Sequence, residues 1–200
     1  MARLSCARNW KARRTLLNTI GKIASAWLLA FTLLALQPAH AREPFTLESV
    51  QSQVHRDYTN IGHLSTSTLV DMFSHKEDVL LLDVRERDEF AVSHIAGAQR
   101  VDPGIWSSTF LKQFGDKVKG KTVVFYCSVG VRSSRLATRV QTALKKQGAQ
   151  HVFNLDGGVF AWHNEARALV NGQGATDYVH PFDGTWGKLV KRQALVKSVP

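Results

Sequence analysis

The sequence predicts an α/β fold in which a mainly parallel, five-stranded sheet carries helices on both of its faces. Short apolar or β-branched runs alternate along the chain with segments of helical periodicity, which is the pattern of successive strand–helix units. The run at 79–84 is almost continuously apolar, as is typical of a strand covered on both faces. A length of 200 residues allows one such domain with short additions at its ends.

Five segments are expected to form the strands of this sheet. The clearest is 121–126, because it is rich in β-branched and aromatic residues. In chain order, the strands are expected at 57–62, 79–84, 98–101, 121–126 and 152–155.

The helices are indicated by their ends as well as by their apolar spacing. Ser65 is a favourable N-cap for a helix through Phe73. Pro103 is expected to open a helical stretch, and Gly148 closes the clearest helix of the chain. In chain order, the helices are expected at 47–55, 65–73, 86–92, 103–114, 133–147 and 158–169.

Residues 1–41 have the features of a cleavable signal peptide, which predicts a periplasmic or secreted protein. Basic residues precede an uncharged run of 14 residues (Ile23–Leu36), and Ala39–Ala41 places small residues where a signal peptidase cleaves. The run is shorter than the roughly 20 residues that cross a bilayer as a helix. An uncleaved anchor is the less favoured alternative, and Arg13–Arg14 leaves the twin-arginine export route open beside the general secretory one.

The net charge of +10 lies at the two ends of the chain. Residues 1–41 contain six basic side chains and no acidic one, and the chain beyond Asp183 contains four basic and no acidic ones. The residues between them therefore carry 16 side chains of each sign. A neutral body of this kind excludes a nucleic-acid-binding domain.

The chain is expected to divide into a lead-in segment (42–57), a domain (58–170) and a basic C-terminal tail (171–200). Glycine and proline punctuate this tail, and its end at 188–199 alternates basic and apolar residues as a weak amphipathic helix does. Three states remain open for it: solvated, docked on the domain or a partner, or in contact with anionic lipid.

Cys127 is the candidate functional residue, because it ends the clearest strand and the clearest helix is expected six residues later. Ligands of open α/β sheets bind beyond the carboxyl ends of the strands. Gly130 permits a positive φ, so the loop 128–133 can curl and turn its N–H groups inward as an anion site. Such surroundings lower the pKa of a thiol from about 8.5. Removal of Cys6 with the signal peptide would leave Cys127 without a disulfide partner and so, we expect, as a nucleophile.

Three separated segments resemble motifs of the single-domain rhodaneses, which are sulfurtransferases. These segments are Leu82–Glu86, His94–Ala98 and Cys127–Ser133, and they are followed by the turn Leu155–Gly158 and by Trp162. The resemblance covers roughly 58–170 and implies the rhodanese-like three-layer fold.

The resemblance implies a persulfide mechanism on Cys127. A donor such as thiosulfate would deliver sulfur to the thiolate, and a nucleophilic acceptor (cyanide, or a small or protein thiol) would remove it. The loop residues implied to cradle the persulfide are Ser128, Val129, Gly130, Val131, Arg132 and Ser133. Arg132 would attract an anionic donor, whereas the neutral Ser128 and Val129 stand where many thiosulfate-using relatives carry a basic residue.

Four further residues are expected to support the site rather than react: Asp83, Arg85, His94 and Arg135. Trp106 and Trp162 are expected in the core or in the pocket wall. No cofactor is predicted, and no metal, because the eight histidines show no metal-ligand spacing. The oligomeric state is left undetermined.

Two other functions remain as alternatives. A non-catalytic rhodanese-like interaction module would keep the fold, although such modules commonly lack the cysteine. A cysteine phosphatase or arsenate reductase also places cysteine in an anion-binding loop. The phosphatase loop needs arginine at position 133, where this chain has Ser133.

Overall fold

The computed structural model describes residues 44–198. The signal peptide and the membrane anchor considered for 1–41 lie outside the described residues. Among the helices of the described part, none is both long enough and apolar enough to cross a membrane.

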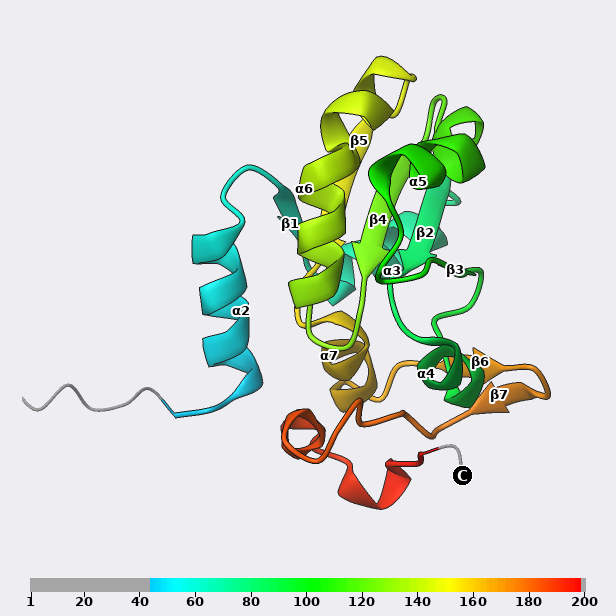
Figure 1. Ribbon diagram of the computed structural model, residues 1–200. Coiled ribbons are helices and arrows are strands. Elements are labelled where there is room, and N and C mark those ends of the chain that lie inside the picture. Colours follow the sequence, from blue (N-terminus) through cyan, green and yellow to red (C-terminus); the bar gives the residue numbers. More distant parts are fainter. Residues whose placement is uncertain (1–43, 199–200) are drawn as a thin grey trace, which may run out of the picture. The chain divides into compact units, whose positions relative to one another are not determined.

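A five-stranded, all-parallel sheet forms the centre of the fold (Figure 1), which confirms the predicted fold class. Its strands lie in the order β1-β5-β4-β2-β3. Their bounds are β1 (Gly62–Leu64), β2 (Val79–Asp83), β3 (Gln99–Arg100), β4 (Thr122–Tyr126) and β5 (His151–Leu155). The central strand β4 is buried along its whole length, as its β-branched and aromatic composition predicts. Because all strands are parallel, the segments that follow β2, β4 and β5 meet at one edge of the sheet.

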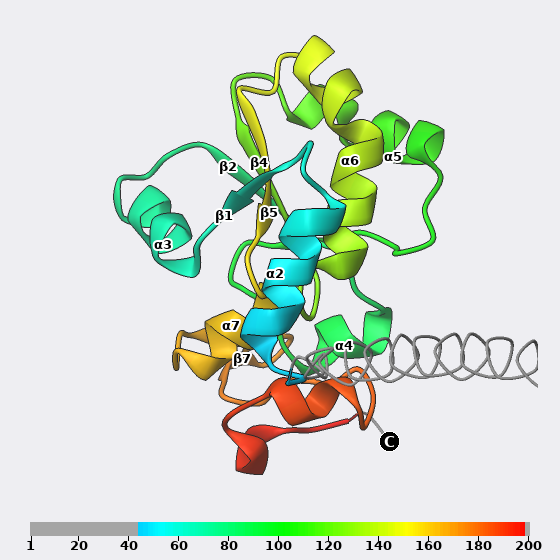
Figure 2. The ribbon, with the colours of Figure 1, turned by 90° about the vertical axis from the view of Figure 1, so that its left-hand side faces the viewer.

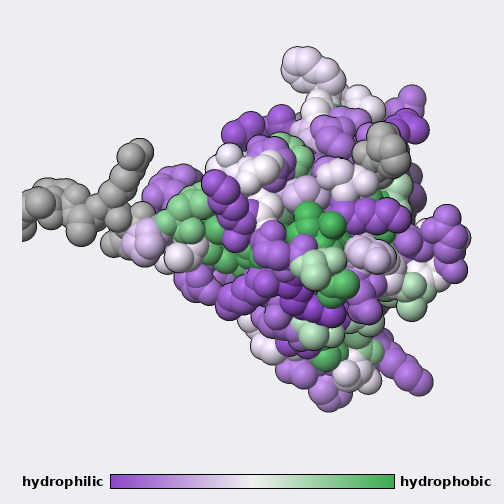
Figure 3. All heavy atoms as spheres, turned by 90° about the horizontal axis from the view of Figure 1, so that it is seen from below, coloured by the Kyte–Doolittle hydropathy of each residue, from purple (hydrophilic) through white to green (hydrophobic). Residues whose placement is uncertain are grey.

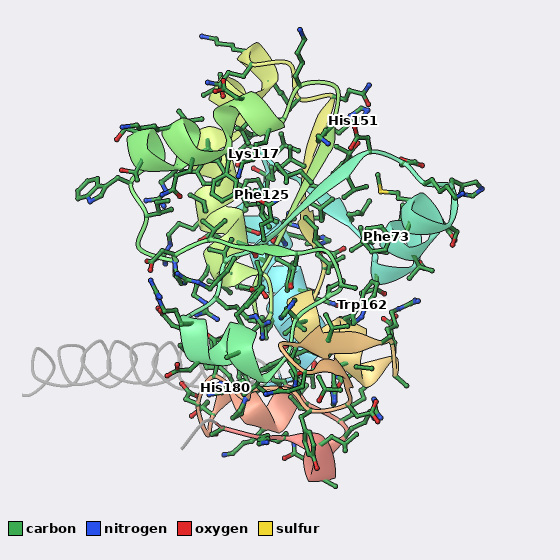
Figure 4. All side chains as sticks on the ribbon, turned by 90° about the vertical axis from the view of Figure 1, so that its right-hand side faces the viewer. Phe73, Lys117, Phe125, His151, Trp162 and His180 are labelled. Atoms are coloured by element: carbon green, nitrogen blue, oxygen red, sulfur yellow. The ribbon has the colours of Figure 1, made fainter. Side chains whose placement is uncertain are left out.

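Helices cover both faces of the sheet (Figure 2). Their bounds are α2 (Leu47–Asp57), α3 (Thr66–Ser74), α4 (Arg87–Val92), α5 (Ser107–Phe114), α6 (Val131–Lys146) and α7 (Gly158–Asn164). On one face, α5 and α6 bury Phe110 and Leu136 against Leu82 and Phe125. On the other face, α2, α3 and α7 share a second apolar cluster that includes Trp162. The exposed ring of Phe73 lies edge to face with Trp162, and both residues are labelled in Figure 4.

Several expected element bounds, and the expected position of Trp106, need correction. The first strand begins at Gly62 rather than at 57, because α2 continues to Asp57 and Tyr58 N–H still donates to Val54 O. The stretch opened by Pro103 becomes helical at Ser107, after a turn held by Asp102.

Helix α7 ends at Asn164, five residues earlier than expected, because Ala166 has a φ of +55°. Trp106 is 80% exposed at the start of α5 and belongs to neither core nor pocket, whereas Trp162 is buried.

The C-terminal segment is folded against the domain. It contains an antiparallel hairpin of β6 (Leu169–Asn171) and β7 (Gly174–Thr176), followed by 3₁₀ turns at Trp186–Leu189 and Gln193–Leu195 instead of a helix over 188–199. Its apolar residues Val179, Leu189 and Val190 are buried in the cluster of α2 and α7. Of the three states open for the tail, docking on the domain is the one observed. Figure 3 shows the molecule from below the view of Figure 1, the side on which the C-terminal segment lies, and apolar patches interrupt an otherwise hydrophilic surface there.

Candidate active site

Cys127 follows directly after β4, at the edge of the sheet where the parallel strands end. Its side chain is 1% exposed, and it lines a cavity of about 100 Å³. The other lining residues are Ser128, Val129, Val131, Arg132, Phe182 and Trp186. A larger cavity, of about 250 Å³, lies beside α4 and the β6–β7 hairpin, and no residue of the Cys127 loop lines it. The small cavity is therefore the candidate active site.

The loop after Cys127 curls as Gly130 was expected to allow. Gly130 has a φ of +100°, and its N–H donates to Cys127 Sγ at 3.2 Å. Helix α6 already begins at Val131, two residues earlier than predicted, so Arg132 and Ser133 lie in its first turn. The thiol consequently lies at the N-terminus of a 16-residue helix, whose dipole favours a negative charge there.

The surroundings of Cys127 favour its thiolate. Burial alone would raise the pKa of this thiol, but the charge of Arg132 and the N–H groups of Ser133 and Val129 lower it below its ordinary value. Ser133 is itself held in place, since its hydroxyl donates to Asn154 Oδ1 at 2.6 Å. A buried thiolate that opens onto a cavity is suited to nucleophilic attack.

Arg132 is paired with Glu89, a residue that the sequence analysis did not single out. Nη1 and Nη2 of Arg132 donate to the two carboxylate oxygens of Glu89 at 2.7 and 2.8 Å. Ser128 completes the cluster, because its hydroxyl donates to Glu89 at 2.8 Å and accepts from Arg132 at 2.9 Å. This pairing changes the expectation for Arg132, because the Glu89 carboxylate offsets part of the positive charge that an anionic donor would meet.

The Glu89 carboxylate is ionised although it is 2% exposed. Burial raises its pKa, but the hydrogen bonds and the charge of Arg132 outweigh that effect and hold the pKa below its usual value. An acidic residue in the first turn of α4 is favoured by the helix dipole, which is the one signal in the sequence that points to Glu89.

We expect Glu89→Gln to lower the KM for thiosulfate by about three- to tenfold, since it frees the positive charge of Arg132 for a dianion. The measurement is steady-state kinetics with thiosulfate, alongside thermal melting to verify folding. Asp88→Asn is the matched control, because it removes the same charge from an exposed neighbour on the same helix. A KM that is unchanged in Glu89→Gln, or lowered equally in Asp88→Asn, would contradict the expectation.

Asp83 and Arg85 form a buried pair behind the site. Arg85 Nε and Nη2 donate to the Asp83 carboxylate at 2.8 and 2.7 Å, and Nη2 also donates to Ser93 O at 2.6 Å. Tyr126, directly before Cys127, accepts a hydrogen bond from Ile95 N–H through its hydroxyl. These contacts tie the ends of β2 and β4 to the segment after α4, and neither Asp83 nor Arg85 lines the cavity.

The other two supporting candidates do not line the cavity. His94 stacks on Phe90 at 3.7 Å between ring centroids, and its backbone pairs with Val170. Arg135 is exposed on α6 and does not line the cavity, which corrects the expectation that it supports the site.

The docked C-terminal segment supplies one wall of the cavity. This contribution was not predicted from the sequence. The Phe182 ring lies 4.6 Å from Cζ of Arg132, and Trp186 lines the same cavity. Figure 4 shows His180, two residues before Phe182, where this segment meets α4. Phe182 and Trp186 are isolated aromatics in a Gly- and Pro-rich stretch, so no periodicity marks them as wall residues.

The first turn of α7 packs directly on the backbone of the Cys127 loop. Val159 N–H donates to Cys127 O at 2.8 Å, and Phe160 N–H donates to Ser128 O at 3.0 Å. Gly158, with a φ of +54°, lies so close that a Cβ there would collide with Cys127 O. These contacts fix the backbone of Cys127 and thereby the position of its thiol.

Comparison with known proteins identifies similar sequences and a similar fold. The rhodanese-like domain model matches residues 65–165. The thiosulfate sulfurtransferase GlpE of Coxiella burnetii is 33% identical over 106 residues, which are 52% of this chain and 87% of GlpE. A tRNA uridine(34) hydroxylase of Aster yellows witches'-broom phytoplasma is 27% identical over 76% of this chain and 48% of its own length. The structure also resembles the crystal structure of a thiosulfate sulfurtransferase from Pseudomonas aeruginosa, with a TM-score of 0.50 and 18% sequence identity. The superposed region covers 64% of this chain and 23% of that one. This similarity concerns the fold alone.

Proposed function

The chain belongs to the rhodanese-like family, and from that membership we propose that it is a sulfurtransferase that carries sulfane sulfur as a persulfide on Cys127. The observation that carries the proposal is the thiol itself: its Sγ accepts the Gly130 N–H, its pKa is lowered, and it lines a small cavity. None of these features would be needed in a module that only binds other proteins.

The transfer takes place in two displacements. The Cys127 thiolate attacks the outer sulfur of thiosulfate, a new S–S bond forms, and sulfite leaves with the electron pair of the broken bond. Cyanide or a thiolate then attacks the outer sulfur of the persulfide and releases the Cys127 thiolate unchanged. The Gly130 N–H and the first turn of α6 would stabilise the negative charge on sulfur in both steps.

The lining of the cavity favours a weakly charged donor over a dianion. Arg132 is paired with Glu89, which offsets its charge, and Phe182 and Trp186 form an apolar wall. We therefore propose that persulfides of small or protein thiols are better partners than thiosulfate. The basic and apolar segment at 1–41 supports a further proposal, that the enzyme works in the periplasm or outside the cell.

The aromatic wall predicts a difference between two donors. Trp186→Ala is expected to raise the KM for benzenethiosulfonate about tenfold while changing the KM for thiosulfate less than about threefold, because the phenyl ring loses apolar contact. Steady-state kinetics with both donors measure this. Tyr178→Ala is the control, since Tyr178 belongs to the same segment but lines the other cavity. Equal changes with both donors would argue against a role of the wall in donor selection.

Sulfur loading tests the proposed function directly. Incubation with thiosulfate should add one sulfur atom, about 32 Da, to the peptide that contains Cys127, and cyanide should remove it with formation of thiocyanate. Intact-mass and peptide mass spectrometry measure both steps. A Cys127 peptide of unchanged mass with thiosulfate and also with a small-molecule persulfide would overturn the proposal.

A further inference from the structure

Three potential metal ligands from separate elements meet beside the turn that follows β5. His55 lies in the last turn of α2, His63 in β1 and Asp156 directly after β5, and their ligand atoms all lie within 4.8 Å of one another. His55 Nε2 is 2.7 Å and His63 Nδ1 is 3.4 Å from the same carboxylate oxygen of Asp156. The sequence shows no ligand spacing here, because β1 and β5 are far apart in the chain and adjacent in the sheet.

The hydrogen bonds of His63 leave one ring nitrogen with a free lone pair. Its Nε2 lies 3.3 Å from Tyr58 O, and a carbonyl oxygen only accepts, so Nε2 carries the proton. In the neutral ring, Nδ1 is then an acceptor, and this buried atom has no hydrogen-bond partner within residues 44–198. It faces a carboxylate oxygen, which is also an acceptor. A cation placed between these two acceptors would bind both of them.

One of the distances already fits a transition-metal ion. Zinc binds histidine nitrogen and carboxylate oxygen at about 2.0–2.2 Å in tetrahedral geometry, which places two ligand atoms about 3.4 Å apart. His63 Nδ1 and Asp156 Oδ1 have that separation. The bond from His63 to a backbone carbonyl is the usual outer contact of a metal-binding histidine. His55 must turn to reach the same ion, and its side chain is 48% exposed, which leaves room for that turn.

We propose that His63, Asp156 and His55 bind a divalent transition-metal ion of the zinc type, with water as a further ligand. Imidazole and carboxylate ligands select such ions over Mg²⁺, which requires oxygen ligands. The ion would join α2 to the central sheet at Asp156. Asp156 precedes Gly157 and Gly158, whose turn packs on the Cys127 loop, so the ion would also stiffen the support of the thiol.

Zinc titration of the full chain, purified without a histidine tag and carrying Cys127→Ser to remove the thiol, tests the proposal. We expect saturable binding of one Zn²⁺ in isothermal titration calorimetry and a rise of several degrees in Tm with Zn²⁺. Mg²⁺ should produce neither effect. His63→Ala and Asp156→Asn should each weaken the site at least about tenfold. His75→Ala is the matched control, because it removes an exposed imidazole outside the cluster.

Two results would overturn the proposal. One is Zn²⁺ affinity in His63→Ala and in Asp156→Asn equal to that of the parent chain, which would place the ion elsewhere. The other is the absence of saturable Zn²⁺ binding in the parent chain, which would leave the cluster as an ordinary His–Asp contact. Asp156→Asn keeps the shape of the side chain, so it remains informative if His63→Ala fails to fold. Neither result bears on sulfur transfer by Cys127, so this proposal and the proposed function can fail separately.

Discussion

Cys127→Ser is expected to abolish sulfur transfer, lowering kcat/KM with thiosulfate and cyanide by at least about 10³-fold. Serine keeps nearly the size of the cysteine side chain and can accept the hydrogen bond from Gly130 N–H, so the shape of the cavity and its aromatic wall are unchanged. The hydroxyl is not ionised near neutral pH, and it cannot form the S–S bond that holds the transferred sulfur. Thiocyanate formation at saturating donor measures the loss.

The chain offers a matched control for this substitution. In the full chain, from which the proposed signal peptide has not been removed, Cys6→Ser makes the same chemical change at the other cysteine of the sequence and should leave kcat/KM within about twofold of the parent. Both variants should melt at nearly the parent temperature. Transfer retained by Cys127→Ser would show that Cys127 is not the sulfur carrier, and transfer lost in Cys6→Ser would show that a second cysteine takes part.

The centre of the site could be predicted from the sequence because its determinants are local. A β-branched strand, a cysteine at its end and Gly130 three residues later fix where the thiol lies and how its loop curls. The start of α6 was placed two residues late, because Val131 and Arg132 carry no capping signal and Gly130 itself is the N-cap.

The surroundings of the thiol could not be predicted in the same way, because they come from distant segments. Glu89 reaches Arg132 only once α4 meets the first turn of α6. Phe182 and Trp186 reach the cavity through a segment that has neither helical nor strand periodicity. Its burial depends on single contacts, such as that of Asn164 with Leu189 O, rather than on a repeating pattern. A linear sequence read by periodicity favours a solvated tail for such a segment.

Gly158→Ala is expected to destabilise the fold by about 2–4 kcal/mol and to impair transfer as well. The position has a φ of +54°, and a Cβ there would collide with Cys127 O and lie 2.8 Å from Ser128 O. Both contacts are with backbone, so a side chain cannot simply move aside. Relief requires the Cys127 loop to shift and costs the hydrogen bonds of Val159 and Phe160 to that loop. Thermal melting should show a fall of roughly 5–15 °C in Tm.

The decisive comparison is with Gly172→Ala, which makes the same change where a Cβ meets no atom within 4 Å. This control should change the free energy of unfolding by less than about 0.5 kcal/mol and leave transfer intact. If Gly158→Ala melts at the same temperature as Gly172→Ala, the first turn of α7 does not press on the Cys127 loop. If it is destabilised but retains full kcat at low temperature, the turn supports the fold without positioning the thiol. Loss of both stability and kcat in Gly158→Ala alone would assign the backbone behind Cys127 a positioning role that the loop motif by itself does not reveal.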